Sequence, residues 1–277
     1  MKWRIGKRSD NVVDKRGIGA GGLSGGVALI IVVVSWFLGV DPRQMLGLAE
    51  QVAAPSGEQG KPPPANDEKA DFVRAILGET EEVWSALLKQ GYQAPRLVLF
   101  SGAVRSACGS ATSASGPFYC PADQQVYLDF SFFQQMEQRL GGGGDFAYAY
   151  VIAHEVGHHV QNLTGASSQV DRIRQSGGNI QGSTGPLVRL ELQADCFAGV
   201  WGYHTQKRHQ WLEPGDIEEA LNTASAIGDD RLQRQTQGEV VPDSFTHGTS
   251  EQRVRWFKAG FESGDPGKCD TFASSHL

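Results

Sequence analysis

The pentapeptide His154-Glu155-Val156-Gly157-His158 is the feature that most constrains how this chain can fold. Two histidines four residues apart on a helix project from the same face, one turn from each other. Their imidazole nitrogens can then bind one tetrahedral metal ion, and Glu155 lies beside the first of them. The pentapeptide alone is moderately specific, because it also arises by chance in unrelated chains. The apolar stretch directly before it favours a strong helix.

A second segment, Glu191-Leu-Gln-Ala-Asp195, places two carboxylates on one face of another predicted helix. We expect the two helices to cross with these faces opposed. One carboxylate then completes the metal site, and the other accepts a hydrogen bond from a ligand histidine. A solvated helix face is the alternative. Ionised groups among apolar side chains are costly unless they are paired or bound to metal, which favours the metal site. The apolar neighbours are Leu190, Leu192, Ala194, Phe197, Ala198 and Val200.

Together, the two segments resemble the pattern of the gluzincin metallopeptidases. This resemblance implies that Glu191 is the third zinc ligand and that Asp195 orients His154. The second segment is also similar to that of the membrane-associated CAAX-prenyl endopeptidases, whose pattern continues with a histidine and, six residues later, an arginine. His247 and Arg253 stand at that spacing here, with a glycine where that group usually has a proline after the histidine.

Five strings of the sequence extend the resemblance to nearly the whole chain. They are Ser9-Asp-Asn-Val12, Gly116-Pro-Phe-Tyr-Cys-Pro-Ala-Asp123, Val151-Ile-Ala-His-Glu-Val-Gly-His-His159, Gln193-Ala-Asp-Cys-Phe-Ala-Gly199 and Val241-Pro-Asp-Ser-Phe-Thr-His-Gly248. In these strings the chain resembles the bacterial putative neutral zinc metallopeptidase family (YpfJ type). The resemblance implies a zincin-like (gluzincin) domain, and it says more about the fold than about the substrate.

The ligand set indicates what chemistry to expect. Three protein ligands leave one coordination position for water, which is the arrangement of a catalytic zinc ion. Zinc lowers the pKa of that water to about 7. Glu155 is the predicted general base, which takes a proton from the attacking water and delivers it to the leaving amine. His247 is the candidate donor to the oxyanion, and Arg253 is expected to pair with Glu191.

We therefore predict a zinc-dependent peptidase with one Zn²⁺ per chain and a peptide or protein as substrate. The segment Gln125-Val-Tyr-Leu-Asp129 is a candidate edge strand above the cleft, able to pair with an extended peptide, and an ordinary sheet strand is the alternative. Two other functions use the same residues. One is a non-catalytic, zinc-stabilised envelope binding or scaffold protein with His247 as a fourth ligand. The other is a zinc amidohydrolase acting on a non-peptide amide.

The N-terminal region contains an uncharged apolar run over 23–40, about as long as a short membrane-spanning helix. Six basic residues precede it, so the positive-inside rule predicts a cytoplasmic head over 1–22. The chain would cross the bacterial inner membrane once, with a flexible Pro/Gly-rich linker over 41–66 and a zinc metallopeptidase domain over 67–277 on the periplasmic side. A cleaved signal peptide is the alternative to this anchor.

Charge and cysteine content agree with an exported domain. Residues 1–66 carry a net charge of +3 against −6 for the whole chain, which leaves −9 on the remainder and disfavours nucleic acid as a partner. Four cysteines suggest two disulfides. Local pairing of Cys108 with Cys120 is the simplest choice and leaves Cys196 with Cys269. A cytoplasmic zinc site is the alternative, but no Cys-x-x-Cys spacing supports it.

Hydrophobic periodicity predicts an α+β fold with a small sheet early and a mostly helical C-terminal half. The expected strands cover 95–100, 118–120 and 125–129. The expected helices cover 68–90, a segment from about 131 to the glycine run, 145–163, 186–208, 214–227 and 249–263. Within the 145–163 helix, His159 points about 100° away from the metal face, and we interpret it as a surface or hydrogen-bonded histidine.

Overall fold

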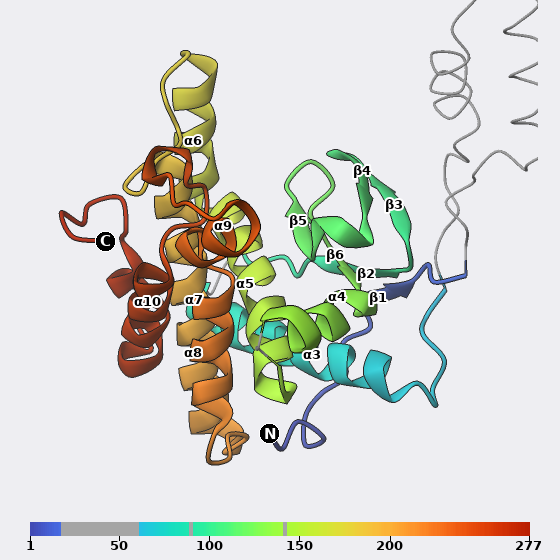
Figure 1. The fold of residues 1–277 in the computed structure, drawn as a ribbon. Coiled ribbons are helices and arrows are strands. Elements are labelled where there is room, and N and C mark those ends of the chain that lie inside the picture. The colour runs from blue at the N-terminus through green and yellow to red at the C-terminus, as the bar shows by residue number, and fades with distance from the viewer. Residues whose placement is uncertain (18–60, 89–90, 141–142) are drawn as a thin grey trace, which may run out of the picture.

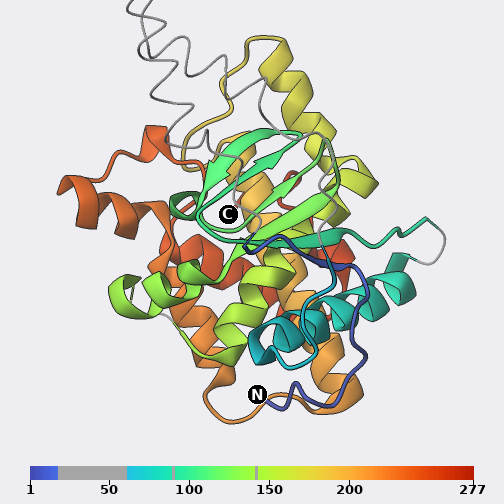
Figure 2. The same cartoon turned by 90° about the vertical axis from the view of Figure 1, so that its right-hand side faces the viewer.

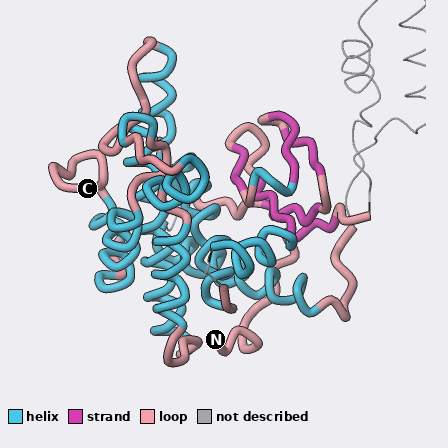
Figure 3. Tube along the Cα trace, in the orientation of Figure 1, coloured by secondary structure: helices cyan, strands magenta, loops and turns pink. Residues whose placement is uncertain are grey.

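The computed structural model describes residues 1–17, 61–88, 91–140 and 143–277. Helices form one side of the molecule and the strands gather at the other (Figures 1 and 3), so the predicted α+β class is confirmed. The described α-helices are α3 (Glu68–Leu88), α4 (Phe130–Gln135), α5 (Asp145–Thr164), α6 (Ala166–Gln175), α7 (Pro186–His209), α8 (Asp216–Ala226), α9 (Asp229–Gln237) and α10 (Ser250–Ser263). The described strands are β1 (Val12–Asp14), β2 (Arg96–Phe100), β3 (Ala103–Ser106), β4 (Gly109–Thr112), β5 (Phe118–Cys120) and β6 (Gln125–Asp129).

The main sheet has the strand order β1-β2-β6-β5. β1, β2 and β6 run parallel, and β5 is antiparallel to β6. The prediction that Gln125–Asp129 forms an edge strand is therefore wrong, because β6 has hydrogen-bonded neighbours on both sides. Its ordinary-strand alternative is confirmed, and β5 is the edge strand at that side of the sheet.

Strands β2 and β6 are apolar on both faces because both faces are covered. Leu97 and Leu99 of β2 join the large core shared with the helices. The alternate residues Val98 and Phe100 pack with Tyr127 in a second, small cluster that also receives residues of the β3–β4 hairpin. Side chains alternate across a strand, so one continuous apolar run serves two cores.

The two helices that carry the predicted metal ligands pack against each other. Helix α5 begins after Gly144 and ends at Gly165, whose φ of 83° is the left-handed conformation that glycine adopts without strain. Helix α7 begins at Pro186, in the first helical position, where a missing N–H costs nothing. Helices α6 and α9 were not predicted, because both are short and mostly polar, so too few apolar positions mark them as helices.

Helices α7 and α10 cross at very short range. A Cβ on Gly260 would lie 1.9 Å from the carbonyl oxygen of Cys196, and one on Gly199 would lie 2.1 Å from that of Phe257. A disulfide between Cys196 and Cys269 joins α7 to the turn that follows α10, and a second disulfide joins Cys108 to Cys120. Both predicted pairings are thus confirmed.

The N-terminal residues 1–17 form an arm that packs along α3 (Figure 2). Trp3 is buried against Phe72, with ring centroids 5.3 Å apart. Arg8 donates two hydrogen bonds of 2.8 Å to the carboxylate of Asp71. The arm then supplies β1, which pairs in parallel with β2. The arm is thus part of the core rather than a separate head.

This arm makes the predicted single-pass localisation at the inner membrane wrong. Residues 1–17 contact the domain that carries the candidate metal ligands, whereas one crossing at 23–40 would put them on opposite sides of a bilayer. The predicted anchor at 23–40 and residues 41–60 of the predicted linker lie outside the described residues. Within the described part of the chain, no helix combines the length and the apolar character needed to span a membrane.

The close crossing of α7 and α10 leads to a test of stability. Gly260→Ala should destabilise the protein by at least about 1–3 kcal/mol, because the new methyl group collides with backbone and cannot be relieved by a side-chain rotation. Urea unfolding of the full chain measures this change. The matched control is Gly267→Ala, whose Cβ would meet only side-chain atoms of Asp265, and equal stability of the two variants would contradict the claim.

Candidate metal centre

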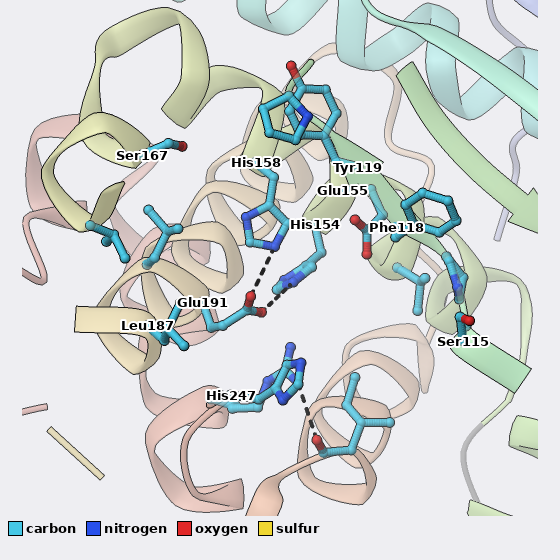
Figure 4. A pocket seen from close by; sticks show the side chains of 18 of the residues that line it. Ser115, Phe118, Tyr119, His154, Glu155, His158, Ser167, Leu187, Glu191 and His247 are labelled. Atoms are coloured by element: carbon cyan, nitrogen blue, oxygen red, sulfur yellow. Dashed lines mark hydrogen bonds and ion pairs between the residues drawn. The ribbon is translucent and has the colours of Figure 1, made fainter. Parts of the chain in front are cut away.

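The candidate site lies in a cleft of about 630 Å³ between the helices and the edge of the main sheet (Figure 4). Helix α5 contributes His154, Glu155 and His158. Helix α7 contributes Leu187, Leu190 and Glu191 from the other side. Strand β5 and the segment before it border the cleft with Ser115, Gly116, Pro117, Phe118 and Tyr119.

The three predicted metal ligands come together in this cleft. One ligand atom each of His154, His158 and Glu191 lies within 4.8 Å of the others. Nε2 of His154 is 3.2 Å from one Glu191 carboxylate oxygen, and Nε2 of His158 is 3.4 Å from the other. Donors around a tetrahedral zinc ion, with bonds of about 2.0–2.1 Å, lie about 3.3 Å apart. Two imidazoles and one carboxylate are also a known donor set for catalytic zinc, so these residues fit the ion.

Gly157, between the two histidines, allows helix α7 to come this close. A Cβ at this position would lie 3.1 Å from the carbonyl oxygen and 3.2 Å from the Cα of Ala194. A side chain there would push the α7 backbone away from α5. The glycine inside the pentapeptide thus brings Glu191 within reach of the histidines.

Asp195 is the fully buried carboxylate behind the ligands. It accepts a hydrogen bond from Nδ1 of His154 at 2.9 Å and one from the hydroxyl of Tyr150 at 2.5 Å. Arg253 donates to both of its oxygens, each at 2.9 Å. Asp195 therefore lies where the sequence analysis expected it, beside His154. The expected pairing of Arg253 with Glu191 is wrong, since the guanidinium binds Asp195 instead.

The charges in this cluster shift each other's pKa. Burial alone would raise the pKa of Asp195, but Arg253 and His154 lower it to about 2. Burial alone would lower the pKa of His154, but Asp195 and Glu191 raise it to about 10. In the metal-free protein the His154 ring is therefore a charged imidazolium at neutral pH, with a proton on each nitrogen. A metal ion that binds its Nε2 must displace the proton on that nitrogen.

Glu155, the predicted general base, is 8% exposed, and its carboxylate is directed into the cleft (Figure 4). It lies on the same helix as both histidines and lines the same cavity. The position of Glu155 beside the metal ligands could be predicted from the sequence, because the helix itself places this residue next to His154.

His247 borders the cleft and is held by a carboxylate that the sequence analysis missed. Asp229 accepts hydrogen bonds from the backbone amides of Thr246, His247 and Gly248 at 2.7, 2.6 and 3.1 Å. Its other oxygen lies 3.2 Å from Nδ1 of His247. Asp229 is the first residue of α9 and follows Gly228. An acidic residue directly after a glycine is a signal for the start of a helix, and this signal in the sequence could have located α9.

His159 is buried, and both of its ring nitrogens have partners. Nδ1 lies 3.0 Å from the hydroxyl of Tyr119, and Nε2 lies 2.6 Å from the carbonyl oxygen of Gln93. The hydrogen-bonded interpretation of His159 is confirmed. Through this contact, the histidine beside the metal site ties α5 to the edge strand β5.

Comparison with known proteins gives matches over nearly the entire chain. Residues 1–272 match the family described as "Putative neutral zinc metallopeptidase". The uncharacterized protein YpfJ of Escherichia coli (strain K12) is 49% identical over 291 residues, covering 99% of this chain and all of the relative. The uncharacterized protein Rv2575 of Mycobacterium tuberculosis (strain H37Rv) is 47% identical, covering 74% of this chain and 71% of the relative. No solved structure matches.

The ionisation of Asp195 gives a testable pH dependence. Its pKa in the folded, metal-free protein lies below its ordinary value of 3.8, so its stabilising effect is present above about pH 4 and is lost as the pH falls toward 2. Between pH 5 and pH 2 the free energy of unfolding should fall by on the order of 2 kcal/mol more in the natural protein than in Asp195→Asn.

Urea unfolding in the presence of a chelator, at a series of pH values, measures this difference. The matched control is Asp171→Asn, because the Asp171 side chain is 53% exposed. Its pH profile should run parallel to that of the natural protein. If the profile of Asp195→Asn also runs parallel, Asp195 is not held ionised by Arg253 and His154.

Proposed function

The chain belongs to the putative neutral zinc metallopeptidase family, and from this premise we propose that it is a zinc-dependent peptidase. The observation that carries the proposal is the joint placement of His154, His158 and Glu191 with Glu155 in one open cleft. Two imidazoles and a carboxylate suit a zinc ion that keeps one coordination position free. A neighbouring carboxylate can then serve proton transfer, which a purely structural site does not need.

Glu155, Asp195 and His247 have separate roles in the proposed hydrolysis. A bound zinc ion supplies Lewis-acid chemistry, since it lowers the pKa of water and polarises a carbonyl group. Glu155 takes a proton from the attacking water and delivers it to the leaving amine. Asp195 accepts a hydrogen bond from Nδ1–H of His154 and so leaves Nε2 as the nitrogen that would hold the metal ion. His247, oriented by Asp229, donates a hydrogen bond to the oxyanion of the substrate.

Strand β5 supplies the means of holding an extended peptide. It is the last strand at its side of the described sheet, and Phe118 and Tyr119 line the cleft. Unpaired main-chain groups of an edge strand bind an added strand with little regard to its sequence. The hydrogen bond between His159 and Tyr119 joins this edge to α5. The substrate is thus proposed to lie along β5 with its scissile bond near Glu155.

The zinc-stabilised scaffold alternative requires a fourth protein ligand. Among the described residues, the candidate ligand cluster consists of His154, His158 and Glu191. His247 does not join this cluster. Three protein ligands would leave a fourth position for water on a bound zinc ion, which favours catalysis over a purely structural role.

Glu155→Gln tests the proposed role of the base. The variant should bind one zinc ion per chain, like the natural protein, because the amide leaves all three ligands in place. Its kcat/KM on casein or a peptide library should fall by about 10²–10⁴-fold, because the amide cannot accept the proton. Zinc content and hydrolysis are measured on the full chain, which retains the N-terminal arm.

Glu262→Gln is the matched control, since Glu262 is exposed on α10 and does not line the cleft. It should retain both zinc and full activity. If the natural protein binds no zinc, the proposed metal centre is wrong. If the natural protein and Glu155→Gln both bind zinc and cleave equally well, Glu155 is not the base. Zinc binding without turnover in either protein would instead support the scaffold alternative.

A further inference from the structure

Gln161 is a buried polar residue that neither the sequence analysis nor the proposed mechanism has used. It lies on α5, one turn after the metal-ligand candidate His158, and it is 0% exposed. Its amide nitrogen donates to the carbonyl oxygen of Leu190 at 2.6 Å and to the side-chain oxygen of Gln193 at 3.2 Å. Its amide oxygen lies 2.8 Å from Nδ1 of His158.

These contacts settle which way the amide faces. An amide NH₂ group has two hydrogens, and both have acceptors on α7, so the amide oxygen must face His158. The orientation of Gln193 is fixed in turn, because its own nitrogen donates to the carbonyl oxygen of Cys269 at 3.0 Å. Cys269 is bonded to Cys196 of α7. The chain of hydrogen bonds therefore runs in one direction, from His158 through Gln161 and Gln193 to the Cys269 carbonyl.

The direction of this chain determines the tautomer of His158. An amide oxygen only accepts, so the imidazole must donate from Nδ1. In the neutral ring, Nε2 then carries the lone pair, and this nitrogen is the one that faces Glu191 at 3.4 Å. The neutral ring of His154 also carries its lone pair on Nε2, because its Nδ1 donates to a different partner, the carboxylate of Asp195. The two histidines are thus oriented by separate hydrogen-bond systems, one charged and one neutral.

Gln161 also bridges the two ligand-bearing helices. Leu190, whose carbonyl it binds, directly precedes Glu191, so the same side chain contacts a histidine ligand and the backbone beside the carboxylate ligand. We propose that Gln161 is a positioning residue of the metal centre, which holds His158 in the metal-binding tautomer and in register with Glu191. This inference rests on the proposed function, since it assigns Gln161 to the same zinc site.

The zinc affinity of three full-chain proteins tests the proposal, by competition with a chromophoric chelator at fixed pH. Gln161→Met keeps the length of the side chain but removes the acceptor, and its zinc affinity should fall by about 10–100-fold. Gln161→Glu still accepts from Nδ1 of His158 but loses the bonds to α7. Its zinc affinity should recover relative to Gln161→Met, while its metal-free thermal stability should be lower than that of the natural protein.

Asn162→Leu is the matched control, because Asn162 is the next amide on α5 and donates to Tyr119 rather than to a ligand. Its zinc affinity should stay within about twofold of the natural protein. Gln193→Met, which breaks the next bond in the chain, should give a loss smaller than that of Gln161→Met. This variant decides the question if Gln161→Met does not fold, since an unchanged zinc affinity there would overturn the proposal.

The outcomes separate this inference from the proposed function. If the natural protein binds zinc and Gln161→Met binds it within twofold as tightly, Gln161 does not position the centre and the inference fails alone. If affinity and metal-free stability fall together in both Gln161 variants without recovery in Gln161→Glu, the role is merely structural and the inference also fails. If the natural protein binds no zinc, the proposed function fails and this inference fails with it.

Discussion

The buried carboxylate of Asp195 connects three helices and contacts His154, a candidate ligand of the metal centre. It lies on α7, accepts hydrogen bonds from His154 and Tyr150 of α5, and accepts two more from Arg253 of α10. A buried carboxylate is tolerated only when its charge is paired and its oxygens are hydrogen-bonded. Here Arg253 pairs the charge, and both oxygens accept hydrogen bonds. Loss of either member of such a pair costs about 3–5 kcal/mol, because the other charge is left buried. The geometry of the metal centre and the cohesion of the helices therefore depend on the same interaction.

Close packing of backbone against backbone brings these charges together. Gly199 and Gly260 let α10 approach α7, and Gly157 lets α5 approach α7. Each position would place a Cβ against main-chain atoms of the neighbouring helix, which cannot move aside as a side chain can. The small residues thus determine whether Arg253 reaches Asp195 and whether Glu191 reaches the histidines.

The main sheet borders the cleft of the candidate metal centre on the side opposite α7. Its outer strand β5 is joined to α5 by the hydrogen bond between Tyr119 and His159, and to the β3–β4 hairpin by the disulfide between Cys108 and Cys120. The sheet itself is completed by the N-terminal arm through β1. Segments from the first and the second half of the chain therefore meet at a cleft whose ligands all come from two helices.

The local features of the site could be predicted from the sequence, because each depends on a helical spacing of a few residues. The pairing of His154 with His158, the position of Glu155 and the partnership of Glu191 with Asp195 belong to this class. The two disulfides followed from the cysteine count and their separation. Only the tertiary structure decided that Arg253 binds Asp195, that Asp229 holds His247, and that β5 rather than β6 is the edge strand. These contacts join residues distant along the chain, so no local periodicity records them, and they arise only when the helices and the sheet pack together.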